Sequence, residues 1–203
     1  MISIGSTLVE VKLKHLRPTQ MTVGFKEVEK KRKSWEKLKA DDCRQAMRQE
    51  LFPAVKGPGK SFYILDHHHK AVALLRENSA TVQVGVVKDL SMLKPRDFWI
   101  FLDHYSWVHP YDEAGERRAF KDMPKNFEEL KDDPYRSLAG EVRDAGGFAK
   151  SDAPFLDFLW ANHLRIWIPR KRLENTPDEA LSDALALARS KKSAHLPGWP
   201  GKA

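Results

Sequence analysis

Three consecutive histidines lie between an aspartate and a lysine in the segment Asp66-His67-His68-His69-Lys70. Imidazole side chains titrate near neutral pH, so they suit proton transfer or contact with phosphate. Residues 61–65 are aromatic and β-branched, which predicts a buried strand, and residues 70–77 have helical apolar spacing. The N–H groups at the start of a helix carry partial positive charge and bind phosphate. The junction is therefore the predicted phosphate site, with Asp66 as a candidate N-cap.

Two other interpretations of the histidines stay open. They could form a metal site if His104, His109 and Asp112 folded nearby, although adjacent side chains in a chain point in different directions. One or two of them could instead be core residues with satisfied hydrogen bonds. Three in succession at a predicted strand–helix junction favour a binding site.

Polar residues near the N-terminus add further candidates. Thr19 and Gln20 lie in a predicted turn after Pro18, where they could contact a ligand or hold the turn by hydrogen bonds. Glu27 lies early in a predicted helix over residues 25–38. Glu27 and Glu29 are also i,i+4 neighbours of lysines, so a plain surface role remains open.

A second group of candidates lies at a helix that begins near Pro134. Arg136 and Ser137 occupy its first turn. Arg136 could reach a phosphate, or it could pair with a structural carboxylate such as Asp157. Both interpretations of Arg136 stay open.

The elements around these residues are predicted from periodicity and from Pro and Gly positions. Strands come early in the chain and helices late. This order predicts an α/β fold of mixed α+β type: a small sheet with helices and a C-terminal helical region. The domains are predicted as an α/β core over 1–125, a helical extension over 126–190 packed on it, and a flexible tail over 191–203. The expected elements are strands at 7–13, 61–65 and 80–87, helices at 25–38, 41–51 and 70–77, helices beginning at 95, 126, 134, 154 and 177, and loops at 52–59 and 110–125.

Composition sets the class of protein. The chain has 203 residues and a formal net charge of +7. Residues 1–100 hold 19 Lys and Arg against 11 Asp and Glu, whereas residues 101–164 hold 8 against 13. Cys43 is the one cysteine of the sequence, which excludes an internal disulfide and a multi-cysteine metal cluster. With no long apolar run and no visible secretory signal, we expect a cytoplasmic protein that does not enter a membrane.

The segment 64–71 resembles the strand–Asp-Gly-His-His-Arg–helix signature of the ParB/sulfiredoxin superfamily. Residues 13–20 resemble the N-terminal strand of that superfamily and its Pro-x-Gln turn. The blocks 132–150 and 154–161 are similar to one branch, the putative ParB-like nuclease family. The resemblance extends over about residues 7–168.

This resemblance implies a nucleotide, ATP or CTP, held by its phosphates at the helix start, with Mg²⁺ as a further cofactor. It implies a nuclease or phosphodiesterase, or a nucleotide-dependent kinase or NTPase. Asp66, His68, His69 and Glu27 would then be catalytic. The implied phosphate- or nucleotide-binding residues are Thr19, Gln20, His67, Lys70, Arg136 and Ser137; no metal ligands are assigned among the residues.

Two departures from the signature affect this expectation. His67 replaces the glycine of the motif, so close approach of the backbone to phosphate is less assured. Lys70 replaces its arginine, which keeps the charge but loses the bidentate fork. The thiol of sulfiredoxin would fall at His68, so that chemistry is excluded. The alternative function is a non-catalytic module on the same scaffold that binds DNA or a protein partner, and the oligomeric state stays open.

Overall fold

The computed structural model describes residues 7–36, 51–76 and 81–201. By contacts within the chain, it divides into two compact units, residues 1–132 and residues 133–203. The chain has the predicted mixed α/β composition, with strands in the first unit and helices in both. Within the described residues, no helix is long and apolar enough to cross a membrane.

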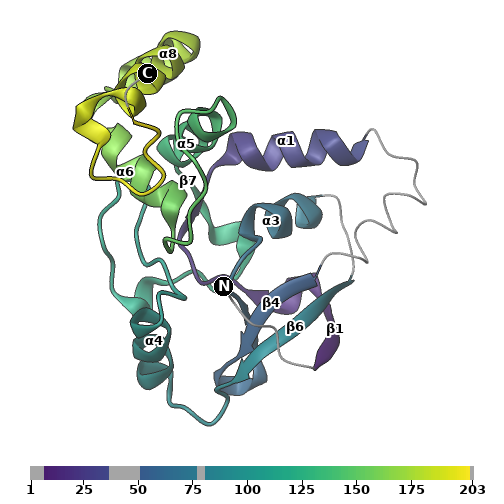
Figure 1. Cartoon of the computed structure of the whole chain (residues 1–203). Helices are drawn as coiled ribbons and strands as arrows, with labels where there is room; N and C mark the ends of the chain where they lie inside the picture. Colours follow the sequence, from purple (N-terminus) through teal and green to yellow (C-terminus); the bar gives the residue numbers. More distant parts are fainter. Residues whose placement is uncertain (1–6, 37–50, 77–80, 202–203) are drawn as a thin grey trace. The chain divides into compact units, whose positions relative to one another are not determined.

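The first unit is built on a curled mixed sheet of five strands in the order β1-β6-β4-β5-β2 (Figure 1). β1 and β6 are antiparallel, as are β4 and β5, whereas β4 runs parallel to β6 and β2 parallel to β5. The strands are β1 (Leu8–Lys12), β2 (Leu16–Arg17), β4 (Leu51–Lys56), β5 (Phe62–Ile64) and β6 (Thr81–Asp89). The three predicted strands are therefore present, with small differences at their ends.

Strand β4 corrects the prediction of a loop over residues 52–59. Its side chains Phe52, Ala54 and Val55 are fully buried, because β4 lies between β5 and β6. Proline is normally excluded from an inner strand because it lacks a donor. Here the carbonyl of Pro53 still accepts the N–H of Leu65 at 2.8 Å, and the register with β6 shifts just after it. The loop signals apply only to the residues that follow the strand.

Two helices of the first unit lie beside each other over the sheet (Figure 1). α1 spans Phe25–Glu36 and α3 spans His68–Arg76, two residues earlier than predicted. Val28 of α1 and Leu74 of α3 are fully buried in one core with the sheet. The predicted helix at 41–51 lies outside the described residues, as Cys43 does, except that Leu51 begins β4.

The remainder of the first unit connects the sheet to residue 132. A second small sheet pairs β3 (Thr22–Val23) in parallel with β7 (Lys131–Asp132). α4 spans Pro95–His104, as its proline predicted. The short 3-10 helices of this unit are η1 (Leu13–His15), η2 (Pro58–Lys60), η3 (Phe120–Asp122) and η4 (Phe127–Glu129).

Helices dominate the second unit, and prolines begin two of them. α5 (Pro134–Asp144) and α8 (Pro177–Arg189) both have proline at the first helical position, where no N–H is needed. α6 spans Leu156–Trp167, and α7 (Arg170–Asn175) was not predicted. Thr176 precedes α8 without a capping hydrogen bond from its side chain, and its hydroxyl donates to the carbonyl of Arg172 at 3.3 Å.

The core of the second unit centres on Trp160, which is fully buried and stacks on Phe148 with ring centroids 4.3 Å apart. The last described residues contact this core. The indole N–H of Trp160 donates to the carbonyl of Pro197 at 2.9 Å, and the N–H of Ala149 donates to Gly198 at 2.8 Å. Residues 191–193 form the 3-10 helix η5.

Candidate phosphate site at the start of helix α3

The strand–helix junction turns at His67. Its φ of 67° lies in the left-handed region that favours glycine, the residue that the family signature has at this position. His67 rather than Asp66 directly precedes α3, so the expectation that Asp66 is the N-cap is one residue off. A carboxylate oxygen of Asp66 accepts the N–H of His67 at 2.6 Å, and the Asp66 side chain is 68% exposed.

His68 points into the protein. It is 4% exposed, and its Nε2 atom accepts the N–H of Thr19 at 3.0 Å. An acceptor nitrogen carries no proton, so the ring is the neutral tautomer with hydrogen on Nδ1. Burial, with smaller contributions from His67 and His109, lowers the pKa of His68 to about 3. This histidine therefore holds the loop before α1 and cannot act as a cation near pH 7.

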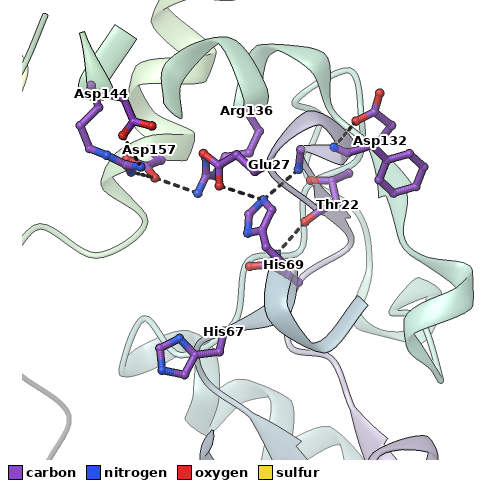
Figure 2. Close-up of polar contacts among 12 residues, drawn as sticks. Thr22, Glu27, His67, His69, Asp132, Arg136, Asp144 and Asp157 are labelled. Carbon is purple, nitrogen blue, oxygen red and sulfur yellow. Dashed lines mark hydrogen bonds and ion pairs between the residues drawn. The ribbon is translucent and has the colours of Figure 1, made fainter. Parts of the chain in front are cut away.

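His69 is also turned inward, and it contacts the start of α1 (Figure 2). Its Nε2 atom accepts the N–H of Gly24 at 3.0 Å. The same atom lies 3.5 Å from Oε2 of Glu27, in the first turn of α1. The two side chains are 11% and 19% exposed, so the imidazole and the carboxylate lie close together and largely shielded from solvent. The sequence proposed both residues without indicating that they touch.

The start of α1 is further fixed by a residue far along the chain. The N–H of Phe25 donates to the carboxylate of Asp132 at 2.7 Å. This contact joins β7 to the first residue of α1, and it sets the position of Glu27 two residues later. Sequence reasoning did not find it, because 107 residues separate the partners.

Thr19 and Gln20 shape the loop between β2 and β3. The hydroxyl of Thr19 donates to the carbonyl of Ile64 at 2.7 Å, and the amide of Gln20 donates to Thr22 at 2.8 Å. Both residues are buried, at 1% and 5% exposed. The N–H of His109 donates to the carbonyl of Thr19 at 2.8 Å. These two predicted ligand contacts thus make the hydrogen bonds of a structural turn, and Lys70, at the third position of α3, is half-buried.

Arg136 and Ser137 lie in the second unit. The guanidinium of Arg136 is 2.7 Å from Oδ2 of Asp157, the partner named from the sequence (Figure 2). Arg143 pairs with the same oxygen, and Arg136 also lies over the ring of Phe158, 5.4 Å from its centroid. Ser137 is 2% exposed. Within the described residues, no group of three or more His, Cys, Asp or Glu has the geometry of a metal site.

Comparison with known proteins gives the class. The family model described as putative ParB-like nuclease matches residues 9–166. The crystal structure of protein Atu1540 from Agrobacterium tumefaciens is similar in fold, with a TM-score of 0.89 and 42% sequence identity. That alignment covers 97% of this chain and 100% of the other. No curated protein matches the chain.

The chain belongs to the putative ParB-like nuclease family, which confirms the resemblance found in the sequence. The matched residues include the loop at 19–24, the junction at 66–70 and both helices that begin there.

Proposed function

We propose that the protein binds a phosphate-bearing ligand, a nucleotide or a nucleic-acid phosphodiester, at the start of α3 and catalyses phosphoryl transfer or phosphodiester hydrolysis. The observation that carries the proposal is the pair of contacts at Nε2 of His69: 3.0 Å to the N–H of Gly24 and 3.5 Å to Glu27. The His69 side chain therefore connects the start of α3 to the start of α1.

Two helix starts at one place suit an anion. Each contributes N–H groups and about half a positive charge from its aligned peptide dipoles. Asp132 already occupies the first N–H of α1, so α3 supplies the main contact to the phosphate. The left-handed turn at His67 provides the backbone shape that glycine gives in the signature. Lys70, in the first turn of α3, adds a positive charge near the proposed phosphate position.

Glu27 is the proposed general base. A carboxylate can take the proton from an attacking hydroxyl or water as its oxygen bonds to phosphorus and the bond from phosphorus to the leaving oxygen breaks, the leaving group departing with that electron pair. His69 cannot take that proton at Nε2 without releasing the N–H of Gly24, for which Nε2 is the acceptor. His69 is therefore a positioning residue: by accepting the N–H of Gly24 it holds the residue before α1, and with it the first turn that carries Glu27. His68 positions the Thr19 loop in the same way.

Asp66 suits a magnesium ion bound with the phosphate. Mg²⁺ is commonly held by one or two carboxylates together with the phosphates of the substrate. The carboxylate of Asp66 is exposed next to the helix start, which fits that chemistry. When bound, the ion would offset the negative charge of Asp66 and of the phosphate.

Calorimetry with ATP, CTP and a short DNA oligonucleotide, each with and without Mg²⁺, tests binding. Lys70→Glu places a negative charge at the helix start and should weaken binding of the phosphate ligand at least roughly tenfold. Lys14→Glu is the matched control, because Lys14 is exposed on η1 and the substitution changes the charge equally. Replacing His68 or His69 is a poorer test of binding, since both hold backbone that shapes the site.

Glu27→Gln tests the chemical step. It should preserve binding and lower turnover by 100-fold or more, the usual contribution of a general base.

The binding test has its own contrary outcome. Equal weakening of ligand binding by Lys70→Glu and Lys14→Glu would mean that binding depends only on net charge. That result, or no binding of any phosphate ligand, would overturn the proposal.

A further inference from the structure

Three aromatic side chains form a continuous surface at the end of α4. The rings of Phe101 and Tyr105 stack with centroids 4.6 Å apart and an interplanar angle of 28°. Tyr105 and Trp107 are 5.3 Å apart at 37°, and Trp107 meets Phe101 at 6.1 Å. We name Phe101, Tyr105 and Trp107 the aromatic shelf. Tyr105 is 53% exposed, and the other two rings are half-buried.

The backbone that positions the aromatic shelf adopts an unfavourable conformation at Ser106. Ser106, between Tyr105 and Trp107, has a φ of 54°, in the left-handed region that non-glycine residues avoid. The N–H of Trp107 donates back to the carbonyl of Leu102 at 2.7 Å, which closes the end of α4 around this turn. A strained turn that leaves a large aromatic ring exposed favours a binding role.

The charges of α4 and of the end of β6 favour an anionic ligand. The ammonium group of Lys88 lies 6.0 Å from the centroid of the Phe101 ring. Lys94 and Arg96 are exposed at the start of α4. Two neighbouring carboxylates already have cationic partners, because Asp89 pairs with Lys56 at 2.9 Å and Asp103 pairs with Arg117 at 2.7 Å. Among the described residues of α4 and the end of β6, the one further carboxylate is Asp97. The cations beside it in this count are Lys88, Lys94 and Arg96.

The shelf is continuous in sequence with the loop of the phosphate site. Trp107 is two residues before His109, whose N–H donates to the carbonyl of Thr19. His109 in turn stacks near Tyr111, with ring centroids 4.6 Å apart. Rings thus recur at residues 105, 107, 109 and 111, along a segment that leads from the shelf to Thr19. Val108 and His109 are themselves buried, so this segment fixes the position of the shelf relative to the loop that His68 holds.

We infer that the aromatic shelf stacks the bases of a single-stranded nucleic acid, and that its phosphodiester backbone continues to the start of α3. Stacking on aromatic side chains beside positive charge is the general way in which proteins bind single strands without reading their sequence. In a duplex the faces of the bases are stacked on each other, so a single strand is the form that fits. This inference rests on the proposed function and names its substrate class.

Fluorescence anisotropy with a labelled oligothymidine of about 12 nucleotides tests the shelf, alongside an abasic oligonucleotide of equal length. Tyr105→Ala should raise the Kd for oligothymidine roughly tenfold and leave the Kd for the abasic strand unchanged. Trp107→Leu should act in the same direction. Met92→Ala is the control, since Met92 is 90% exposed but lies outside the shelf. Circular dichroism and thermal melting show that each variant is folded.

The outcomes separate this inference from the proposed function. If Lys70→Glu weakens nucleotide binding while Tyr105→Ala changes no oligonucleotide affinity, the shelf inference falls and the proposed function stands. If Tyr105→Ala weakens oligothymidine binding but Lys70→Glu has no effect on any phosphate ligand, the shelf binds nucleic acid and the α3 site fails. If Tyr105→Ala instead disrupts a dimer seen by light scattering and leaves oligonucleotide affinity unchanged, the shelf is an interface between copies and the inference is overturned.

Discussion

The Nε2 atom of His68 accepts the backbone N–H of Thr19 at 3.0 Å, and this bond joins the first residue of α3 to the loop before α1. His68→Phe keeps a ring of similar size but removes the acceptor. A buried donor left unsatisfied costs about 1–3 kcal/mol, so urea unfolding should show a loss of that size. His68→Gln, which retains an acceptor oxygen, is the control and should lose less. Equal stability of His68→Phe and the wild type would contradict the structural role.

The same histidine makes stability depend on pH. Burial lowers the pKa of His68 to about 3, from an ordinary value of 6.5, so the unfolded chain binds the proton more tightly than the folded one. The stability is fully present above pH 6.5 and is lost as the pH falls toward 3. The slope approaches about 1.4 kcal/mol per pH unit. Between about pH 7 and pH 4.5, His68→Gln should therefore lose about 2.5 kcal/mol less than the wild type in urea unfolding.

The wild type and His68→Gln share every acidic group, which also titrates in this range, so only the difference between the two proteins reports on His68. Parallel loss of stability in both would show that His68 takes up a proton as readily in the folded chain as in the unfolded one.

The left-handed backbone at His67 predicts an unusual order of stability. His67→Gly relieves the steric conflict of a φ of 67°, whereas His67→Ala retains it. Both variants lose the edge contact between the imidazole and the ring of Phe52, 5.8 Å away. We therefore expect the Gly variant to be about 1 kcal/mol more stable than the Ala variant in thermal or urea unfolding. The reverse order, normal at most positions, would mean that the turn does not adopt this conformation.

The junction illustrates how far sequence reasoning reaches. Local signals predicted α3, the strand before it and the proline-initiated helices, because capping, periodicity and turn chemistry act over a few residues. The pairing of Arg136 with Asp157 was also open to prediction, since both lie on adjacent helices in the sequence. The resemblance to the superfamily signature drew attention to the candidate site at residues 66–70.

Long-range partners were beyond such reasoning. The bonds from Phe25 to Asp132 and from His109 to Thr19 join residues about 90 to 107 apart, and no local pattern encodes which donor meets which acceptor. The inward direction of His68 and His69 likewise involves distant partners, the N–H groups of Thr19 and Gly24. Strand β4 was missed for a related reason, since its burial between two other strands outweighs the loop preference of Pro53.

Gly57 permits close packing at the end of β4. A Cβ atom at this position would lie 2.6 Å from the ring of Tyr63 and 2.8 Å from the ring of Phe98. The two rings pack against each other with centroids 4.6 Å apart and an interplanar angle of 50°, so neither can move freely. Gly57→Ala should destabilise the protein by about 1–3 kcal/mol, the usual cost of overpacking. Gly59→Asn is the control. A Cβ atom added at Gly59 would meet no other atom within 4 Å, and asparagine tolerates the φ of 67° found there.

In the second unit, Asp157 links two arginines through one oxygen. Its Oδ2 atom lies 2.7 Å from the guanidinium of Arg136 and also pairs with Arg143, and the Asp157 side chain is 13% exposed. Asp157→Ala removes the carboxylate that both cations share and leaves like charges close together in a sheltered place. Loss of one member of a buried ion pair costs about 3–5 kcal/mol, and partial exposure of Arg143 reduces this to about 2–4 kcal/mol. Asp144→Ala is the matched control: Asp144 is 48% exposed and 3.4 Å from Arg143, so its loss should cost less than about 1 kcal/mol. Equal costs for the two variants in urea unfolding would show that Asp157 contributes no more than a surface charge.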